Sequence, residues 1–248
     1  MYGTPVVAMP GSGHCLLPLG RPVGLGRRGE DHLYEFGTGG RAFVAWGVPG
    51  DLNVEGEAEY FDSSGRRIDP VDRLSDAVVV IRGEGLSVSI SRGRPVYSAY
   101  YGYSEAPWSY LAMREDGEVT PFGAMDWNWN PYTGHPGLKP MSVTFNKVVS
   151  AILSGRKYYA VERFTAPASG DYVIEGRWFR GKPHADGADI RISRNGAVLA
   201  SGVVADAPFE FGPVTLALEA GDEVDFAVGP NQEDGGNWVE RRITVTGP

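Results

Sequence analysis

The sequence has a single cysteine, Cys15, among its 248 residues. An internal disulfide needs two cysteines and a thiolate metal cluster needs several, so neither can form within this chain. No local motif supplies Cys15 with a base. We therefore expect a small buried apolar group rather than a nucleophile.

Long apolar stretches are also absent, since no window approaches 18 consecutive apolar residues, and no transmembrane helix is predicted. The N-terminal sequence MYGTPVVAMPGSGHCLLPLG lacks the positive start and the unbroken apolar core of a secretory signal, because proline and glycine interrupt it. Two alternatives remain open: the protein stays inside the cell, or the chain is an internal fragment of a secreted protein whose signal lies elsewhere.

Basic residues are outnumbered, with 23 Lys and Arg against 31 Asp and Glu, and the net charge is -8. A nucleic acid or an anionic membrane presents a dense negative surface that such a chain repels. The sequence therefore predicts no nucleic-acid and no membrane partner. A neutral or cationic ligand fits this charge better.

Helical periodicity is scarce, whereas glycine (35) and proline (18) separate short β-branched and aromatic runs. This punctuation predicts many short strands and an all-β fold. Runs suited to strands lie at residues 41–46, 77–81, 86–91, 171–179, 188–193, 214–219, 223–229 and 241–247. After the run 188–193, in which Ile190 and Ile192 share one face, Asn195-Gly196 predicts a tight hairpin.

The pattern changes near residues 91–95, where a charged, strand-rich part gives way to a stretch dense in Tyr, Trp and Pro. We expect two domains, residues 1–93 and residues 94–248.

The first part contains HLYEF, FVAW, FDSSGRR and VVVIRGEG between residues 31 and 91. It resembles the small β-sandwich that follows the catalytic barrel in many glycoside hydrolases. The resemblance implies a structural domain in which Trp46 fills the sandwich core.

From residue 161 on, the elements F.AP.SG.Y.I.G, the NG hairpin and L.AGD.VDFAVGP resemble the jelly-roll modules appended to secreted polysaccharide-degrading enzymes. PWSY and DWNW, further upstream, hold places that belong to the same module. The resemblance implies a second β-sandwich, a jelly roll similar to carbohydrate-binding modules. Together the two resemblances imply a C-terminal accessory region of a glycoside hydrolase.

Three aromatic rings fall in the short stretch DWNWNPYTG, residues 126–134. Sugar binding needs a flat π surface and planar polar groups, which this stretch supplies with Trp127, Trp129 and Tyr132 and with Asn128 and Asn130. In an extended strand the two tryptophans would share one face. The alternative is a hydrophobic plug, and we expect at least one of the tryptophans to be buried.

Two other stretches are candidates for binding. The glycine-rich stretch 229–238 brings Asn231 and Trp238 into a loop, and in RWFRG the side chains of Trp178 and Phe179 point to opposite faces. Calcium prefers carboxylate and carbonyl oxygens, so Asp186, Asp189 and Asp234 are predicted as ligands of a structural Ca²⁺. Neither of the two stretches that contain them matches a full EF-hand loop.

The sequence therefore predicts non-catalytic binding of a polysaccharide or oligosaccharide by an accessory region of a secreted glycoside hydrolase, with the catalytic domain of the parent enzyme as its covalent partner. One alternative is a structural spacer or interaction module. A second is glycosidase activity, which needs a carboxylate pair, and the strand acids Glu162 and Glu175 are the first candidates for it. No nucleophile elbow or phosphate-binding loop is found.

Overall fold

The computed structural model describes residues 22–28, 31–36, 42–75, 77–127, 130–180, 186–232 and 238–248. Nearly all regular structure in these residues is β, with one short 3-10 helix at Pro136–Leu138, so the prediction of an all-β fold is confirmed. Among the described residues, no helix has the length and apolar character needed to cross a membrane. The chain divides into two compact units between Ser91 and Arg92, two residues from the expected boundary.

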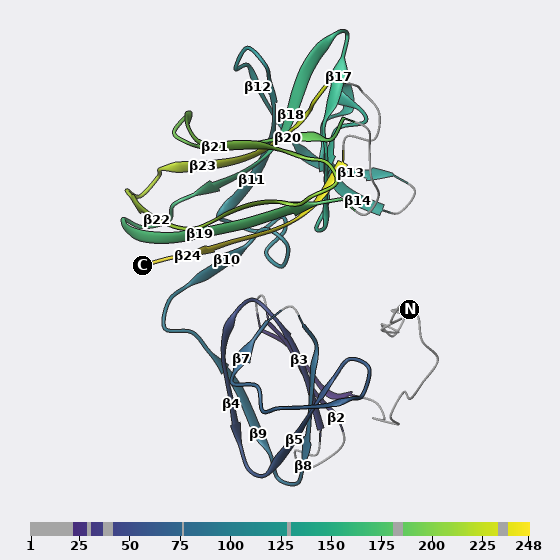
Figure 1. Cartoon of the computed structure of the whole chain (residues 1–248), viewed down its shortest axis with the longest axis vertical. Coiled ribbons are helices and arrows are strands. Elements are labelled where there is room, and N and C mark those ends of the chain that lie inside the picture. Colours follow the sequence, from purple (N-terminus) through teal and green to yellow (C-terminus); the bar gives the residue numbers. More distant parts are fainter. Residues whose placement is uncertain are drawn as a thin grey trace. The chain divides into compact units, whose positions relative to one another are not determined.

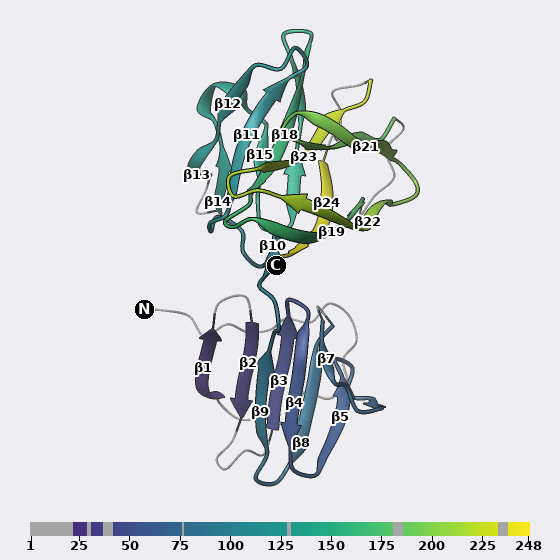
Figure 2. The same ribbon diagram turned by 90° about the vertical axis from the view of Figure 1, so that its left-hand side faces the viewer.

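The first unit is a sandwich of two antiparallel sheets (Figures 1 and 2). Sheet A has the order β1 (Pro22–Arg28), β2 (Asp31–Phe36), β3 (Ala42–Gly47), β8 (Val79–Gly83), β5 (Ala58–Asp62) and β6 (Arg67–Ile68). Sheet B has the order β7 (Arg73–Leu74), β4 (Gly50–Glu55) and β9 (Ser87–Ser91). Side chains from both sheets form one apolar core.

The expectation that Trp46 fills this core is wrong. Side chains alternate along β3, and Phe43 and Ala45 take the positions that face the core. Trp46 therefore points to the other face, where it is half-buried and stacks on His32 (ring centroids 4.6 Å apart) and Tyr34 (5.3 Å).

The second unit is a larger jelly-roll β-sandwich (Figure 1). Sheet C has the order β13 (Gly123–Trp127), β14 (Asn130–Gly134), β15 (Ser142–Val143), β16 (Lys147–Val149), β24 (Trp238–Thr246), β19 (Gly170–Phe179) and β22 (Phe209–Leu218), and β10 (Val96–Ser98) also pairs with β24. Sheet D has the order β12 (Val119–Pro121), β11 (Trp108–Arg114), β18 (Arg156–Thr165), β23 (Glu223–Pro230), β20 (Ala188–Arg194) and β21 (Ala197–Val204), and β17 (Ala151–Leu153) pairs with β18.

Local sequence accounts for the hairpin between β20 and β21. Asn195 (φ 46°) and Gly196 (φ 82°) both have positive φ, which this dipeptide adopts readily, and Arg194 pairs with Ala197 across the turn. Ile190 and Ile192 face the core, as the alternation predicted. The predicted hairpin is confirmed.

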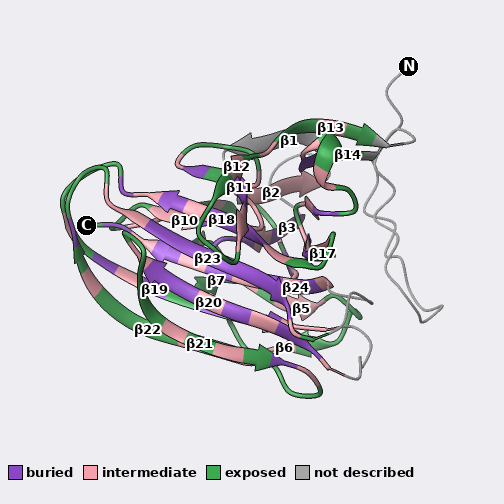
Figure 3. Cartoon of the chain, turned by 90° about the horizontal axis from the view of Figure 1, so that it is seen from above, coloured by how far each residue is buried: buried purple, intermediate pink, exposed green. Residues whose placement is uncertain are grey.

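Aromatic rings fill the space between sheets C and D. Trp178 and Tyr172 enter from β19, and they meet Phe226 of β23 and Phe164 of β18 at centroid distances of 6.1 and 5.7 Å. All four side chains are fully buried. Figure 3 shows the buried residues concentrated on β19, β20, β23 and β24.

A charged pair also lies in this core. Glu162 of β18 and Arg241 of β24 are both 0% exposed, and Arg241 Nε donates to Glu162 Oε2 at 2.7 Å while Nη2 donates to Oε1. Nη1 also donates to the backbone carbonyl of Phe145, and Nη2 to that of Ala99. The pair therefore links the two sheets to two loops.

Substitution of Glu162 by Gln should lower the free energy of unfolding by about 3–5 kcal/mol, because it leaves the Arg241 charge buried without its counter-ion. Chemical denaturation followed by tryptophan fluorescence measures this, since five of the six tryptophans lie in the second unit. Glu118→Gln is the matched control, because it removes an exposed carboxylate that pairs with Arg114 and should change stability by less than about 1 kcal/mol. Equal effects of the two substitutions would contradict the role of the buried pair.

Candidate functional site

The stretch DWNWNPYTG belongs to two paired strands rather than to one extended strand. Residues Gly123–Trp127 run antiparallel to Asn130–Gly134, and Trp127 pairs with Asn130 at the end of the ladder. The expectation for one extended strand, with both tryptophans on one face, therefore does not apply. The structure gives the backbone of Trp127 and Asn130 only, and Asn128 and Trp129 lie outside the described residues.

Tyr132 is half-buried within β14, where it pairs with Met125 of β13. Its ring lies against the backbone of Gly134, so closely that a Cβ added at Gly134 would be 2.8 Å from Tyr132 Cε2. Glycine at this position lets the tyrosine ring lie along the hairpin.

Trp178 lies in the core and has no exposed surface, so no ligand in solution reaches it. The prediction that Trp178 binds a ligand is therefore wrong. The even-numbered residues of β19 face the core, and Phe179 lies on the outer face instead. The indole of Trp178 lies directly beneath Gly176, where a Cβ would come within 2.5 Å of the ring. The Trp178 ring therefore packs against the backbone of β19 on the core side of the sheet.

The structure brings Asp186, Asp189 and Asn231 together at one end of sheet D. The Asn231 side chain donates to the backbone carbonyl of Asp186, and the backbone N–H of Gln232 donates to Asp186 Oδ2 at 2.8 Å. The Tyr159 hydroxyl lies 3.5 Å from Asp189 Oδ2. This cluster joins the segment before β20 to the segment after β23.

Among the described residues, no three His, Cys, Asp or Glu side chains gather in a way that could hold a metal ion. Asp234, the third predicted calcium ligand, lies outside the described residues. The calcium site stays a prediction.

Trp238 is the first residue of β24, and it lies on the outer face of sheet C, which is turned away from the core. Residues along β24 alternate strictly between half-buried and buried, and Trp238 belongs to the half-buried set. Lys147 of the neighbouring strand places its ammonium group 4.2 Å from the centre of the indole ring. This cation–π contact holds the ring in a defined orientation.

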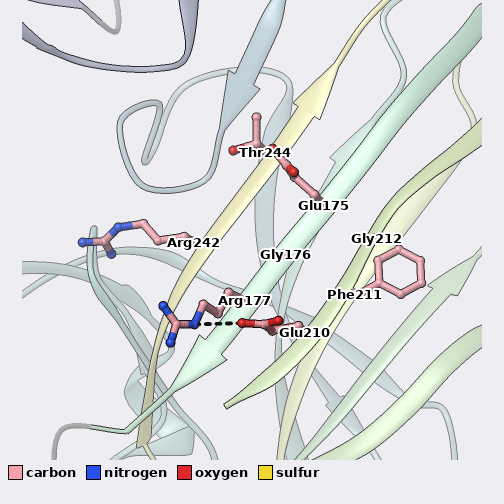
Figure 4. A pocket seen from close by; sticks show the side chains of 8 residues that line it. All are labelled: Glu175, Gly176, Arg177, Glu210, Phe211, Gly212, Arg242 and Thr244. Carbon is pink, nitrogen blue, oxygen red and sulfur yellow. Dashed lines mark ion pairs between the residues drawn. The ribbon is translucent and has the colours of Figure 1, made fainter. Parts of the chain in front are cut away.

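A hollow of about 240 Å³ lies on the same outer face, over β19, β22 and β24 (Figure 4). We call it the β19 hollow. It is lined by Glu175, Gly176, Arg177, Glu210, Phe211, Gly212, Arg242 and Thr244. The volume is below the roughly 300–1,000 Å³ of sites for drug-sized ligands, so it suits a small group such as one ring of a larger molecule.

The polar side chains of the β19 hollow follow from strand register. Glu175 of β19 is directly opposite Thr244 of β24, and Arg177 is opposite Arg242, one pair further along. Figure 4 shows Glu175 and Thr244 close together and both arginine side chains reaching outward. Carboxylate, hydroxyl and guanidinium groups therefore line one short stretch of sheet.

The two opposed arginines would repel one another if nothing else were near. Arg177 forms an ion pair with Glu210 of β22 at 3.2 Å, with both side chains more than half exposed. Arg242 lies 3.8 Å from the centre of the Tyr100 ring and 5.9 Å from that of Phe179. Ion pairing and cation–π contacts thus offset the repulsion between the two guanidinium groups.

Backbone irregularity shapes the β19 hollow. The pairing of β19 with β22 shifts between Ile174 and Gly176, which bends the edge strand. Gly212 has φ +86°, and a Cβ there would lie 2.2 Å from the Ile174 carbonyl oxygen. Only glycine allows β22 to pass this close to β19.

The sequence analysis named Glu175 only as a strand acid for the glycosidase alternative, and it missed Arg177, Glu210, Arg242 and Thr244. Part of this site could have been found from the alternation of side chains along the sequences EGRWF and WVERRITVT. That alternation puts Glu175 and Arg177 on one face of their strand, and Arg242 and Thr244 on one face of theirs. What the sequence did not contain is the pairing of β19 with β24, which lie about 60 residues apart.

Asp189 and Asp222 should show opposite pH effects. Burial raises the pKa of Asp189 above its ordinary value, so the folded protein loses stability as the pH rises from the ordinary value through the raised one. In Asp189→Asn this loss disappears. The free energy of unfolding of this variant minus that of the wild type should therefore increase as the pH rises from about 4, the ordinary pKa of an Asp carboxyl, through the raised pKa of Asp189.

Asp222 is the control, because hydrogen bonds from Asn195, the backbone of Glu219 and Arg194 lower its pKa to about 2. Its stabilising contribution is present above the ordinary carboxyl pKa and is lost on acidification. For Asp222→Asn the same difference should fall as the pH rises from about 2 to about 5. Urea titrations over this pH range measure both, and two pH-independent differences would contradict the assignment.

No family model matches the sequence, and no curated protein matches it. Among solved structures the chain is similar to a family 35 carbohydrate-binding module from Clostridium thermocellum, with 17% identity and a TM-score of 0.31 over 63% of this chain and 100% of that one. It is also similar to a tandem of two CBM22 domains of Xyn10C from Paenibacillus barcinonensis (10%, TM-score 0.32, 89% and 92%). A third similarity is to an isomalto-dextranase from Arthrobacter globiformis (13%, TM-score 0.28, 87% and 36%). At these TM-scores the likeness places no site.

Proposed function

We propose that this chain binds carbohydrate without catalysis, through the outer face of sheet C. One observation carries the proposal: the β19 hollow presents Glu175, Arg177, Arg242 and Thr244 on rigid, paired strands beside aromatic rings. Sugar hydroxyls both donate and accept hydrogen bonds, so a site that offers carboxylates, guanidinium groups and a hydroxyl at fixed positions is suited to them.

The aromatic rings beside the hollow supply the second requirement. Tyr100 and Phe179 contact Arg242, and Phe145, which is 51% exposed, lies 5.5 Å from Tyr100. The C–H face of a pyranose packs against such rings. The hollow and the rings therefore support the recognition of a sugar by both its edge and its face.

Three further statements remain predictions: secretion, attachment to the catalytic domain of a glycoside hydrolase, and a structural Ca²⁺ held by Asp186, Asp189 and Asp234. The binding proposal depends on none of them.

The catalytic alternative depends on a carboxylate pair. Glu162, one of the two strand acids considered, is fully buried against Arg241 and has no access to substrate. Glu175 and Glu210 both line the β19 hollow, but Glu210 is committed to Arg177. Binding is therefore the better supported function.

Affinity electrophoresis against mixed-linkage β-glucan, xylan, glucomannan, dextran and pullulan tests binding. The wild-type chain should be retarded by at least one of them, and Glu175→Ala should weaken that binding about 10- to 100-fold, because a hydrogen bond from a sugar to a charged group is lost. Glu118 is an exposed acid in the connection between β11 and β12 of sheet D, and Glu118→Ala should have no effect.

Absence of retardation by every polysaccharide would favour the spacer alternative. Release of reducing ends by the wild-type chain, abolished by Glu175→Gln, would favour the glycosidase alternative.

A further inference from the structure

We infer that the ligand is a neutral glycan bound along the length of its chain, from the β19 hollow to Trp238, rather than at a chain end. This inference rests on the proposed function and specifies the class of ligand. It follows from the path of β24, from the rings beside that strand and from the balance of charge on its outer face.

The outer residues of β24 form one continuous row. Trp238, Glu240, Arg242 and Thr244 are half-buried, and the residues between them, Val239, Arg241 and Ile243, are 0–1% exposed in the core. Trp238 and Thr244 are six residues apart, which is about 20 Å along a strand. The row is therefore much longer than the β19 hollow at one end of it.

Neighbouring strands extend this row with aromatic and cationic groups. Phe179 is opposite Glu240, between the hollow and Trp238, and its ring lies 5.7 Å from the Arg177 guanidinium. Lys147, also opposite Glu240, reaches over the Trp238 ring. An aromatic ring thus lies at the middle and at the far end of the row, where successive sugar rings of an extended chain would pass.

Charges cancel along the stretch from the β19 hollow to Trp238. Three side chains there are positive and three are negative: Lys147, Arg177 and Arg242, and Glu175, Glu210 and Glu240. A polyanionic glycan would meet three carboxylates on this face and a net charge of -8 on the whole chain. For a neutral glycan the same charged side chains act as hydrogen-bonding partners and give no net repulsion.

Calorimetric titration with oligosaccharides of two and six residues tests the inference. The probes are β-1,4-gluco-, β-1,3-gluco-, α-1,6-gluco- and β-1,4-xylo-oligosaccharides, with oligogalacturonates of the same lengths as anionic counterparts. At least one neutral hexasaccharide should bind about ten-fold or more tighter than its disaccharide, because only the longer ligand reaches Trp238. The oligogalacturonates should bind more weakly than it does.

Trp238→Ala should remove the gain with length, and a urea unfolding transition like that of the wild type reports that the variant is folded. Trp238→Phe keeps a ring and should retain part of the gain. Glu175→Ala should weaken both lengths.

Binding of the neutral sugars with no gain from length, equal weakening of both lengths by Trp238→Ala, or tightest binding of the oligogalacturonate would each overturn the inference while leaving carbohydrate binding intact. Absence of binding by every probe would overturn the proposed function and the inference together.

Discussion

The ion pair between Glu162 and Arg241 determines how the second unit is held together. Two charges fully removed from water are costly, and the cost is offset only when every polar atom finds a partner. Here the guanidinium binds a carboxylate on the opposite sheet and the carbonyls of Ala99 and Phe145. Ala99 and Phe145 lie in two loops, and these loops also carry the rings of Tyr100 and Phe145, which flank the candidate site. A core interaction therefore positions groups on the outer surface.

Arg242, the residue after Arg241, connects this buried ion pair to the outer face of the sheet. Because side chains alternate along a strand, Arg241 points into the core and Arg242 points to the outer face, over Tyr100. The same strand thus supplies the buried charge and a surface charge from adjacent positions. On β19, Gly176 and Trp178 both face the core, and the buried indole lies against the backbone of Gly176, which lines the β19 hollow.

Much of the fold was predictable because it depends on local patterns. Alternation identified the strands, and Asn195-Gly196 identified a hairpin from two residues. Prediction failed where the sequence had to show which face of a strand a tryptophan occupies. Trp46 was expected in the core but lies on the outer face, since Phe43 and Ala45 already occupy the core face. Trp178 was expected to bind a ligand but lies in the core. Large aromatic residues suit either face, so their identity alone does not decide it. The β19 hollow was missed for a different reason, because it depends on the pairing of distant strands.

The two adjacent arginines of β24 bear on how this surface could change in evolution or in the laboratory. A slip of the strand by one residue would still offer Glu162 an arginine, so charge alone does not fix the register. The hydrophobic residues Val239, Ile243 and Val245 fix it, since the slip would expose them. The outward positions 238, 240, 242 and 244 take no part in this choice. They form a set that can be randomised together, to redirect ligand specificity while the scaffold keeps its fold.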